Sequence, residues 1–296
     1  MTKITHRMCA VLCSVCLFAG NLSGIVTPAY ADINSTFEID KDHVLVKYNG
    51  IGGNITIPNG VVTIGHKAFS GCSNLQSVKM PNTVKSIEYS AFDSCSGLKE
   101  VRLSSNLKAI KDSAFWGCGK LEKITLPKSV NEIGTTAFTN CENLQAIYIP
   151  KTVKKIGSYA IGFLYYGDYV PTIDTVIMGE KNSEAMKYSQ KYNIQFFTQS
   201  DLKCKLTNLK HKNSKKIVAN WSKNPLVSGY QIQYAIDKKF SKSVKTKDIS
   251  NNSYTISSAK KNRTYYVRIR GYRTISDKKY YSACSNVKKI NYCQLF

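Results

Sequence analysis

The sequence repeats itself every 23 residues through much of its first half, and this period constrains the fold more than any other feature. Cysteines at positions 72, 95, 118 and 141 are 23 residues apart, and the dipeptide Ala-Phe recurs in step with them from Ala68-Phe69 to Ala137-Phe138. Leucines and aliphatic residues form further columns in phase: Leu75, Leu98, Leu121 and Leu144, then Val78, Val101, Ile124 and Ile147. So many aligned columns indicate a solenoid in which each repeat forms one coil.

A period of this length with the pattern Leu-x-x-Val-x-Leu is typical of leucine-rich repeats. Each coil is expected to contribute a short strand whose side chains alternate between the core and solvent. Val78 and Met80 are predicted to point inward, and Ser77 and Lys79 outward. The cysteine column is predicted to lie inside the stack, because one cysteine per coil makes a ladder and not a tetrahedral metal site.

Both ends of the array depart from the period, as the ends of a solenoid do. Residues 40–53 are interpreted as an N-terminal cap. After Ile156 the pattern weakens, a loop rich in Tyr and Gly follows, and the strand motif returns as Ile173, Val176 and Met178. Residues 184–192 are predicted to form a short helix and residues 194–197 a closing strand.

Three sequence features resemble the BspA-like leucine-rich repeats of bacterial surface and secreted proteins. They are the segment Asn54-Ile55-Thr56-Ile57-Pro58, the recurring Ala-Phe-x-x-Cys-x-x-Leu, and Ile-Gly pairs such as Ile64-Gly65. The resemblance covers about residues 38–198. It implies an extracellular, horseshoe-like solenoid and the adhesion to host proteins or other cells with which better-known members are associated. It does not imply an enzyme.

The N-terminus has the pattern of a secretory signal peptide. Lys3, His6 and Arg7 precede a short apolar run, and Ala29-Tyr30-Ala31 supplies the small-x-small cleavage pattern, so residues 1–31 are predicted to be removed. A membrane anchor is disfavoured, because the apolar run is shorter than the ~20 residues that span a bilayer. We therefore expect a secreted, extracellular protein with no membrane span after cleavage, released or associated with the cell wall.

From about residue 202 the 23-residue period disappears, and short alternating apolar segments separated by polar turns replace it. Seven such segments in about 93 residues indicate a β-sandwich. The predicted strands cover residues 203–209, 216–221, 229–235, 246–249, 253–256, 265–272 and 282–290. The fold class is thus mainly β: a leucine-rich-repeat solenoid with caps over residues 32–200, then a seven-stranded sandwich over residues 201–296.

Residues 227–234 and 264–272 resemble the third and sixth strands of a fibronectin type III domain, and by that resemblance Tyr265 is the corner tyrosine. Ala259 and Cys284 depart from the residues usual in that family. Secretion permits a disulfide among Cys204, Cys284 and Cys293. Connectivity cannot be deduced from sequence, and Cys204–Cys284 is the pairing we favour.

The net charge of +23 is concentrated at one end of the chain. Residues 32–200 hold 18 basic and 15 acidic side chains, whereas residues 201–296 hold 22 basic and 4 acidic ones. Such a module is expected to bind anionic wall polymers or acidic glycans, although a well-solvated lysine-rich surface is an equal alternative. Secretion makes nucleic acid an unexpected native partner. The candidate polyanion contacts are Lys238, Lys239, Lys260, Lys261, Arg263, Arg268 and Arg270.

The sequence offers no catalytic, cofactor or metal motif. The three histidines after the signal peptide make no His-x-x-x-His pair, and nucleophile-elbow, P-loop and dinucleotide patterns are missing. The sequence therefore predicts a secreted bacterial interaction or adhesion protein, not an enzyme, whose partner is a host or bacterial surface protein or glycan. The candidate binding residues are Lys79, Arg102, Thr125 and Tyr148. The alternative is a structural cell-wall component with no specific host ligand, retained by anionic wall polymers.

Overall fold

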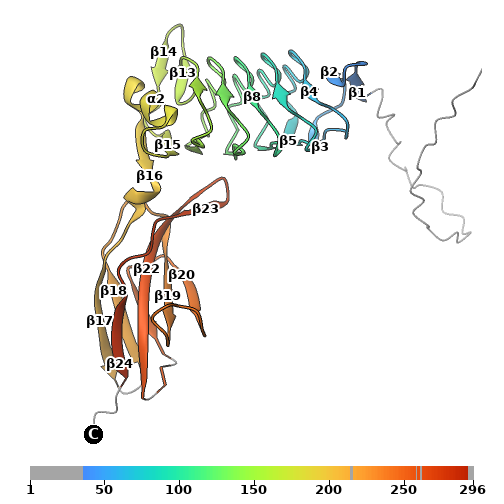
Figure 1. Ribbon diagram of the computed structural model, residues 1–296. Coiled ribbons are helices and arrows are strands. Elements are labelled where there is room, and N and C mark those ends of the chain that lie inside the picture. Colours follow the sequence, from blue (N-terminus) through green and yellow to red (C-terminus); the bar gives the residue numbers. More distant parts are fainter. Residues whose placement is uncertain (1–35, 214–215, 258, 261, 293–296) are drawn as a thin grey trace, which may run out of the picture.

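A computed structural model describes residues 36–213, 216–257, 259–260 and 262–292. The predicted signal peptide, Lys261 and Cys293 lie outside these residues. Figure 1 shows a solenoid of stacked coils, with an elongated β-rich unit extending away from its C-terminal end. Within the described residues, no helix is long and apolar enough to span a bilayer.

Two parallel sheets run along the solenoid, and their register reproduces the sequence period. Paired strands place residues 23 positions apart side by side, as in Val78↔Val101 and Ser86↔Ala109. One sheet contains β1 (Phe37–Ile39), β2 (Val44–Tyr48), β4 (Thr63–Ile64), β6 (Ser86–Ile87), β8 (Ala109–Ile110), β10 (Glu132–Ile133) and β12 (Lys155–Ile156). The other contains β3 (Gly53–Thr56), β5 (Leu75–Lys79), β7 (Glu100–Arg102) and β9 (Lys123–Ile124). The predicted leucine-rich-repeat solenoid is confirmed.

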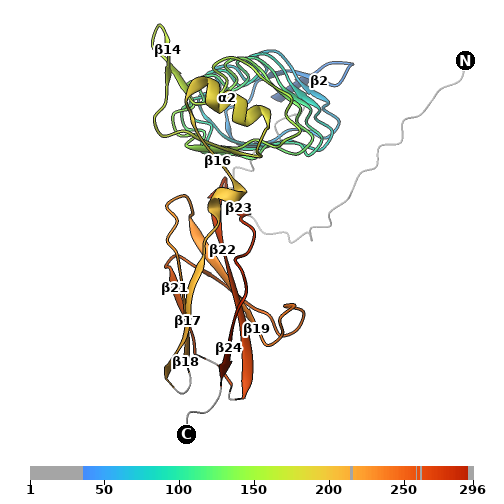
Figure 2. The same cartoon turned by 60° about the vertical axis from the view of Figure 1, so that its left-hand side comes forward.

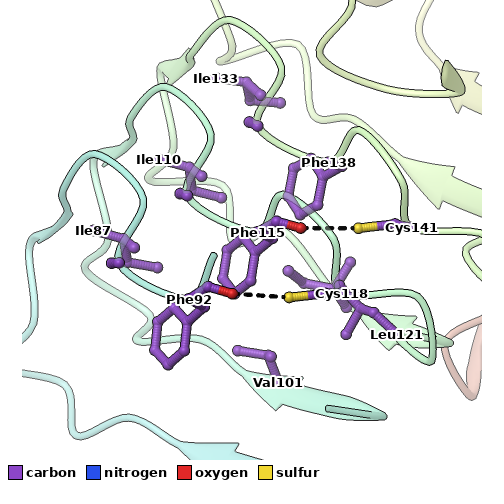
Figure 3. Packing of buried hydrophobic residues seen from close by; sticks show 14 of the residues in the cluster. Ile87, Phe92, Val101, Ile110, Phe115, Cys118, Leu121, Ile133, Phe138 and Cys141 are labelled. Atoms are coloured by element: carbon purple, nitrogen blue, oxygen red, sulfur yellow. Dashed lines mark hydrogen bonds between the residues drawn. The ribbon is translucent and has the colours of Figure 1, made fainter. Parts of the chain in front are cut away.

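The core of the solenoid is a series of columns in which each residue packs on its counterpart in the next coil. The rings of Phe69, Phe92, Phe115 and Phe138 stack with centroids 4.7, 5.1 and 5.3 Å apart and nearly parallel planes. Beside them runs the cysteine ladder of Figure 3. Each buried thiol donates a hydrogen bond to the carbonyl of the phenylalanine 26 positions earlier, at 3.1 Å from Cys118 to Phe92. The ladder therefore satisfies backbone carbonyls inside an apolar core.

The inward orientation predicted for Val78, Met80 and the cysteines is confirmed, because Cys95, Cys118 and Cys141 are buried. Cys72 stands in the first coil of the ladder and is half-buried. Burial still raises the pKa of its thiol to about 11, with a smaller contribution from neighbouring Cys95. Buried thiols of this kind pack as small apolar groups.

The C-terminal end of the solenoid combines a hairpin, a helix and a short parallel sheet. Its elements are β11 (Ala146–Tyr148), β13 (Phe163–Tyr165), β14 (Tyr169–Pro171), β15 (Val176–Gly179), α2 (Glu184–Tyr192), β16 (Gln195–Thr198) and the 3₁₀ helix η1 (Gln199–Leu202). The predicted helix is confirmed, and its N-cap Ser183 accepts a hydrogen bond from the Met186 amide. The interpretation of Ile173 as part of the returning strand motif is wrong, because β15 begins at Val176 and Ile173 is 96% exposed.

The C-terminal unit consists of two sheets packed on a buried core that contains Trp221. One sheet has the order β17 (Leu206–Asn213), β18 (Lys216–Trp221) and β21 (Ser253–Ile256). The other has β20 (Lys245–Ile249), β19 (Gly229–Ala235), β22 (Arg263–Ile275) and β23 (Lys278–Tyr281), and β24 (Lys288–Tyr292) also pairs with β22. The hydroxyl of Tyr265 accepts a hydrogen bond from the Lys260 amide at 2.8 Å, the contact expected of a corner tyrosine.

The described part of this unit has eight strands instead of seven. The strand expected over residues 282–290 is wrong in its first part: β24 begins only at Lys288, and before it the Ser282 and Ser285 amides donate single hydrogen bonds to the β22 carbonyls of Gly271 and Ile269 without forming a strand. In its place, β22 continues to Ile275 and turns back as β23. This additional hairpin, Tyr272–Tyr281, is the part of the sandwich that reaches the solenoid.

Candidate binding face and the cleft between the two units

The outward side chains of β3, β5, β7 and β9 form a polar surface that we call the strand face. The parallel register sets Lys79 beside Arg102, and Ser77 beside Glu100. Neighbouring side chains are paired: Ser77 donates to Asn54 Oδ1 at 2.8 Å, and Arg102 Nε lies 2.7 Å from Glu100 Oε1. The strand face therefore presents a preformed pattern of hydrogen-bonding groups.

Lys79 and Arg102 are exposed on the strand face, as predicted, and line a shallow hollow of about 260 Å³ over β3, β5 and β7. Thr125 is half-buried further along the solenoid. Tyr148 is placed differently from the expectation of a freely exposed ring. Its ring stacks on Tyr280 of the sandwich with centroids 4.4 Å apart, so Tyr148 is half-covered by the other unit.

The Tyr272–Tyr281 hairpin contacts the solenoid through its turn. Lys123 Nζ of β9 forms an ion pair with Asp277 at 2.7 Å, which raises the pKa of that lysine through hydrogen bonding and charge. The Ser276 hydroxyl accepts a hydrogen bond from the Ile124 amide at 3.1 Å and donates one to the Ile124 carbonyl at 3.0 Å. One turn thus holds both the side chain and the backbone of β9.

Ser276 lies beside β9, the last strand of the sheet that carries the strand face. The described strands β3–β5–β7–β9 form one sheet, and β11–β15–β16 form a separate one. The serine hydroxyl supplies the hydrogen bonds that a neighbouring strand would otherwise provide to Ile124. Both turn residues have positive φ, 47° for Ser276 and 61° for Asp277, a conformation in which glycine or asparagine is usual. Their side-chain contacts to β9 explain why polar residues occupy this turn.

An apolar cluster supports the contact between the two units. Val176, Met178, Phe197, Leu202, Ile275 and Tyr280 form a buried core of their own. The Arg273 guanidinium lies 5.0 Å from the Phe197 ring and donates a hydrogen bond to the Leu226 carbonyl. Burial lowers the pKa of this arginine and raises that of Tyr280 to about 12. The junction is therefore packed like a domain interior.

Between the strand face and the hairpin lies a cleft of about 940 Å³. Arg102, Thr125 and Tyr148 line its solenoid side, and residues 276–281 line its sandwich side. The structure thus brings three of the four predicted binding residues into one concave site and adds a wall from the second unit. Sequence reasoning missed that wall. The dipeptide Ser276-Asp277 lies between two segments in which apolar and polar residues alternate, and this pattern could have predicted the hairpin.

The candidate polyanion contacts fall into two groups. Ala235 pairs with Tyr266, so the Lys238–Lys239 loop lies at the same end of the sheet as Lys260 and Arg263, and this end is away from the solenoid. Arg268 and Arg270 lie on the outer surface of β22. Their guanidinium groups are held by Gln233 and Gln231 and lie about 4 Å from the rings of Phe240 and Tyr281. Lys261 lies outside the described residues.

Cys204 and Cys284 are free thiols in this structure. They line one hollow of about 310 Å³. Burial raises the pKa of Cys204 to about 11, and the nearby Cys284 adds a smaller electrostatic contribution. The two residues are therefore neighbours, and their disulfide stays a prediction that the mass shift on reduction and alkylation will test. Within the described residues, no group of three or more His, Cys, Asp and Glu side chains is arranged to hold a metal ion.

Comparison with known proteins places the repeats in a family. Residues 48–164 match the family model described as "BspA type Leucine rich repeat region", in six copies. No curated protein matches the chain.

Three solved structures resemble parts of the chain. A leucine-rich repeat protein of T. pallidum is 30% identical over 51% of this chain and 70% of its own, with a TM-score of 0.44. A leucine rich cell surface protein of Faecalibacterium prausnitzii is 31% identical over 51% of this chain and 38% of its own, with a TM-score of 0.40. The fn3 domain of human contactin 1 is 16% identical over 30% of this chain and 75% of its own, with a TM-score of 0.25.

Proposed function

Because residues 48–164 belong to the BspA type leucine-rich repeat family, we propose that this chain is a secreted bacterial interaction protein that binds a surface protein of a host or another cell. The observation that carries the proposal is the cleft of about 940 Å³ between the strand face and the Tyr272–Tyr281 hairpin. Its walls include Tyr148, Tyr280 and Arg102, residue types that are enriched at the binding hot spots of protein interfaces.

The strand face suits recognition of a folded protein because it is long, rigid and already hydrogen-bonded. Pairing between Arg102 and Glu100, and between Lys123 and Asp277, fixes these side chains before a partner arrives. Fixed side chains lose little conformational entropy on binding. Alternating positive and negative groups favour a partner of complementary pattern over a uniformly charged polymer.

A charge-matched pair of variants of the full chain tests this proposal. The double variant Lys79→Ala/Arg102→Ala alters the strand face, and Lys85→Ala/Lys108→Ala removes two exposed lysines next to the opposite sheet of the same coils. Binding is measured on a panel of immobilised extracellular matrix proteins. We expect the first variant to lose about tenfold in affinity and the second to bind like the wild type. Equal behaviour of the two variants contradicts the proposal.

A second function is favoured by the charge of residues 201–296. We propose that their 22 basic side chains retain the protein on anionic wall polymers or acidic glycans. The contacts lie at the sandwich end that carries Lys238, Lys239, Lys260 and Arg263. This end is free to bind while the strand face holds a protein. If the strand face binds no partner, retention alone describes a structural wall component.

Retention is measured by salt elution of the full chain from heparin and teichoic-acid columns. We expect elution at moderate salt, because exposed charges are screened beyond about 8 Å at physiological ionic strength. Substituting Lys238, Lys239, Lys260 and Arg263 by glutamine is expected to lower the eluting salt concentration. Substituting Lys85, Lys108, Lys128 and Lys151 of the solenoid is the control. Flow-through of the wild type at low salt contradicts a tether.

A further inference from the structure

A tyrosine-rich hairpin projects from the last coil of the solenoid, away from the strand face. Strands β13 and β14 pair antiparallel, with Tyr165 opposite Tyr169, and Figure 2 shows the hairpin extending beyond the outline of the stacked coils. Tyr165 is 42% exposed and Tyr166 is 74% exposed. The exposed Val170 and Ile173 adjoin them. Exposed apolar side chains gathered in this way mark a binding surface more often than a solvated one.

The hairpin stands on a rigid aromatic base. Tyr159 and Tyr169 stack with ring centroids 4.1 Å apart, and Trp116 lies 5.6 Å from Tyr165. Asn140 Oδ1 accepts a hydrogen bond from the Tyr165 amide at 2.7 Å, which ties β13 to the preceding coil. The rings of Tyr165 and Tyr169 are therefore held in place and support the end of the hairpin, where the exposed ring of Tyr166 stands free of other rings of the described residues.

Beside the hairpin is a hollow of about 400 Å³ whose lining includes both an aromatic ring and polar side chains. Tyr166 and Ile173 are exposed apolar residues in this lining. Glu142, Gln145 and Asp174 supply acceptors, and their side chains have no hydrogen bond or ion pair to the described part of the protein. On the strand face, by contrast, Glu100 is paired with Arg102 and Asn54 with Ser77.

The charged residues that line the hollow indicate which class of ligand it can bind. The hollow is lined by two carboxylates and by no lysine or arginine, so it disfavours anions. Most of the chain's positive charge lies in residues 201–296, so it opposes the approach of a polycation to this hollow only weakly, and a lysine-rich peptide is the alternative occupant that the test includes. The exposed ring and the unpaired acceptors fit a neutral ligand that has an apolar face and donates hydrogen bonds. Sugar rings have this chemistry: a face of C–H groups that packs on an aromatic ring, and hydroxyls that donate to carboxylates and amides.

We propose that the hollow between Tyr166, Ile173, Glu142, Gln145 and Asp174 is a binding site for a neutral glycan. One sugar ring stacks on Tyr166, and its hydroxyls donate hydrogen bonds to Asp174, Glu142 and Gln145. The site lies apart from the strand-face cleft and from the basic end of the sandwich, so it is independent of both functions proposed above.

The test measures binding of the full chain to a panel of immobilised neutral hexasaccharides of glucose, N-acetylglucosamine and mannose. We expect saturable binding to at least one of them, with an affinity that does not change between about 50 and 200 mM salt. Tyr166→Ala should weaken this binding about tenfold, the loss of one packed aromatic contact. Asp174→Asn should weaken it less, because the amide oxygen still accepts a hydrogen bond.

The matched control is Tyr89→Ala, which removes a tyrosine that is 48% exposed and stacks on His66 elsewhere on the solenoid. It is expected to leave glycan binding unchanged, and circular dichroism of each variant checks the fold. The proposal is overturned if no hexasaccharide binds at millimolar concentration, or if Tyr166→Ala and Tyr89→Ala behave alike. Binding of a lysine-rich peptide, and of no sugar, at this hollow also overturns it.

Discussion

At the scale of single residues, the solenoid is stabilised by columns in which identical groups stack from coil to coil. Phe115 is fully buried between the rings of Phe92 and Phe138. Its backbone carbonyl also accepts the hydrogen bond of the Cys141 thiol. Phe115 therefore contacts both neighbouring coils, through its ring on either side and through its backbone carbonyl on one side.

Replacing Phe115 by alanine is expected to cost about 3–5 kcal/mol of stability, because it leaves a cavity between two stacked rings. Thermal or denaturant unfolding of the full chain measures this loss. Tyr166→Ala, which removes an exposed ring from the same solenoid, serves as the reference. A loss for Phe115→Ala no larger than that of the reference contradicts the stacked-column description.

Glu132 links two neighbouring coils through Lys111 Nζ at 2.7 Å and Lys155 Nζ at 2.9 Å. Hydrogen bonds from these lysines lower the pKa of Glu132 below its ordinary value of 4.5. A carboxyl whose pKa is lowered by folding stabilises the protein above its unfolded pKa. That stabilisation disappears as the pH falls through the folded pKa.

We therefore expect Glu132→Gln to unfold at a lower temperature than the wild type at pH 7. The difference should shrink as the pH falls below about 4.5, the ordinary pKa that the carboxyl has in the unfolded chain, and disappear below the lowered pKa that it has in the folded protein. Melting temperatures measured for both proteins from pH 7 to pH 3 check this. A constant difference over that range is inconsistent with a titrating ion pair.

At the scale of elements, the Tyr272–Tyr281 hairpin joins the two units. Its turn residue Ser276 is the hydrogen-bond partner of both backbone groups of Ile124. We expect Ser276→Ala to speed amide hydrogen exchange at Ile124, because the amide then lacks an acceptor. The Val78 amide, inside the continuous part of the strand sheet, should be unaffected. Unchanged exchange at Ile124 argues against the contact.

The sequence predicted the solenoid elements well and the junction poorly, for a physical reason. Column periodicity encodes contacts between neighbouring coils, so the inward positions of Val78 and Cys118 follow from spacing alone. The pairing of Tyr148 with Tyr280 joins residues 132 positions apart, and no periodic pattern signals it. The outward position of Tyr148 was predicted, but its coverage by the sandwich was not.

At the scale of the whole molecule, most of the positive charge belongs to the sandwich, whereas the cleft lies between the sandwich and the solenoid. The solenoid is nearly neutral and forms one side of the cleft, while the sandwich is strongly basic and supplies the other side. The basic residues Lys238, Lys239, Lys260 and Arg263 leave the sandwich at the end remote from the solenoid. The sites proposed for a protein partner and for an anionic polymer therefore do not overlap.

The protein partner is proposed to bind in the cleft between the strand face and the sandwich hairpin. Blocking this cleft chemically in the full chain tests the proposal. Thr125→Cys places a thiol in the cleft, and Lys85→Cys places one by the opposite sheet. Each is labelled with a bulky polyethylene glycol maleimide and assayed against the matrix protein that the wild type binds. We expect the label at position 125 to abolish binding and the label at position 85 to leave it intact. Binding that survives at position 125 contradicts the proposal.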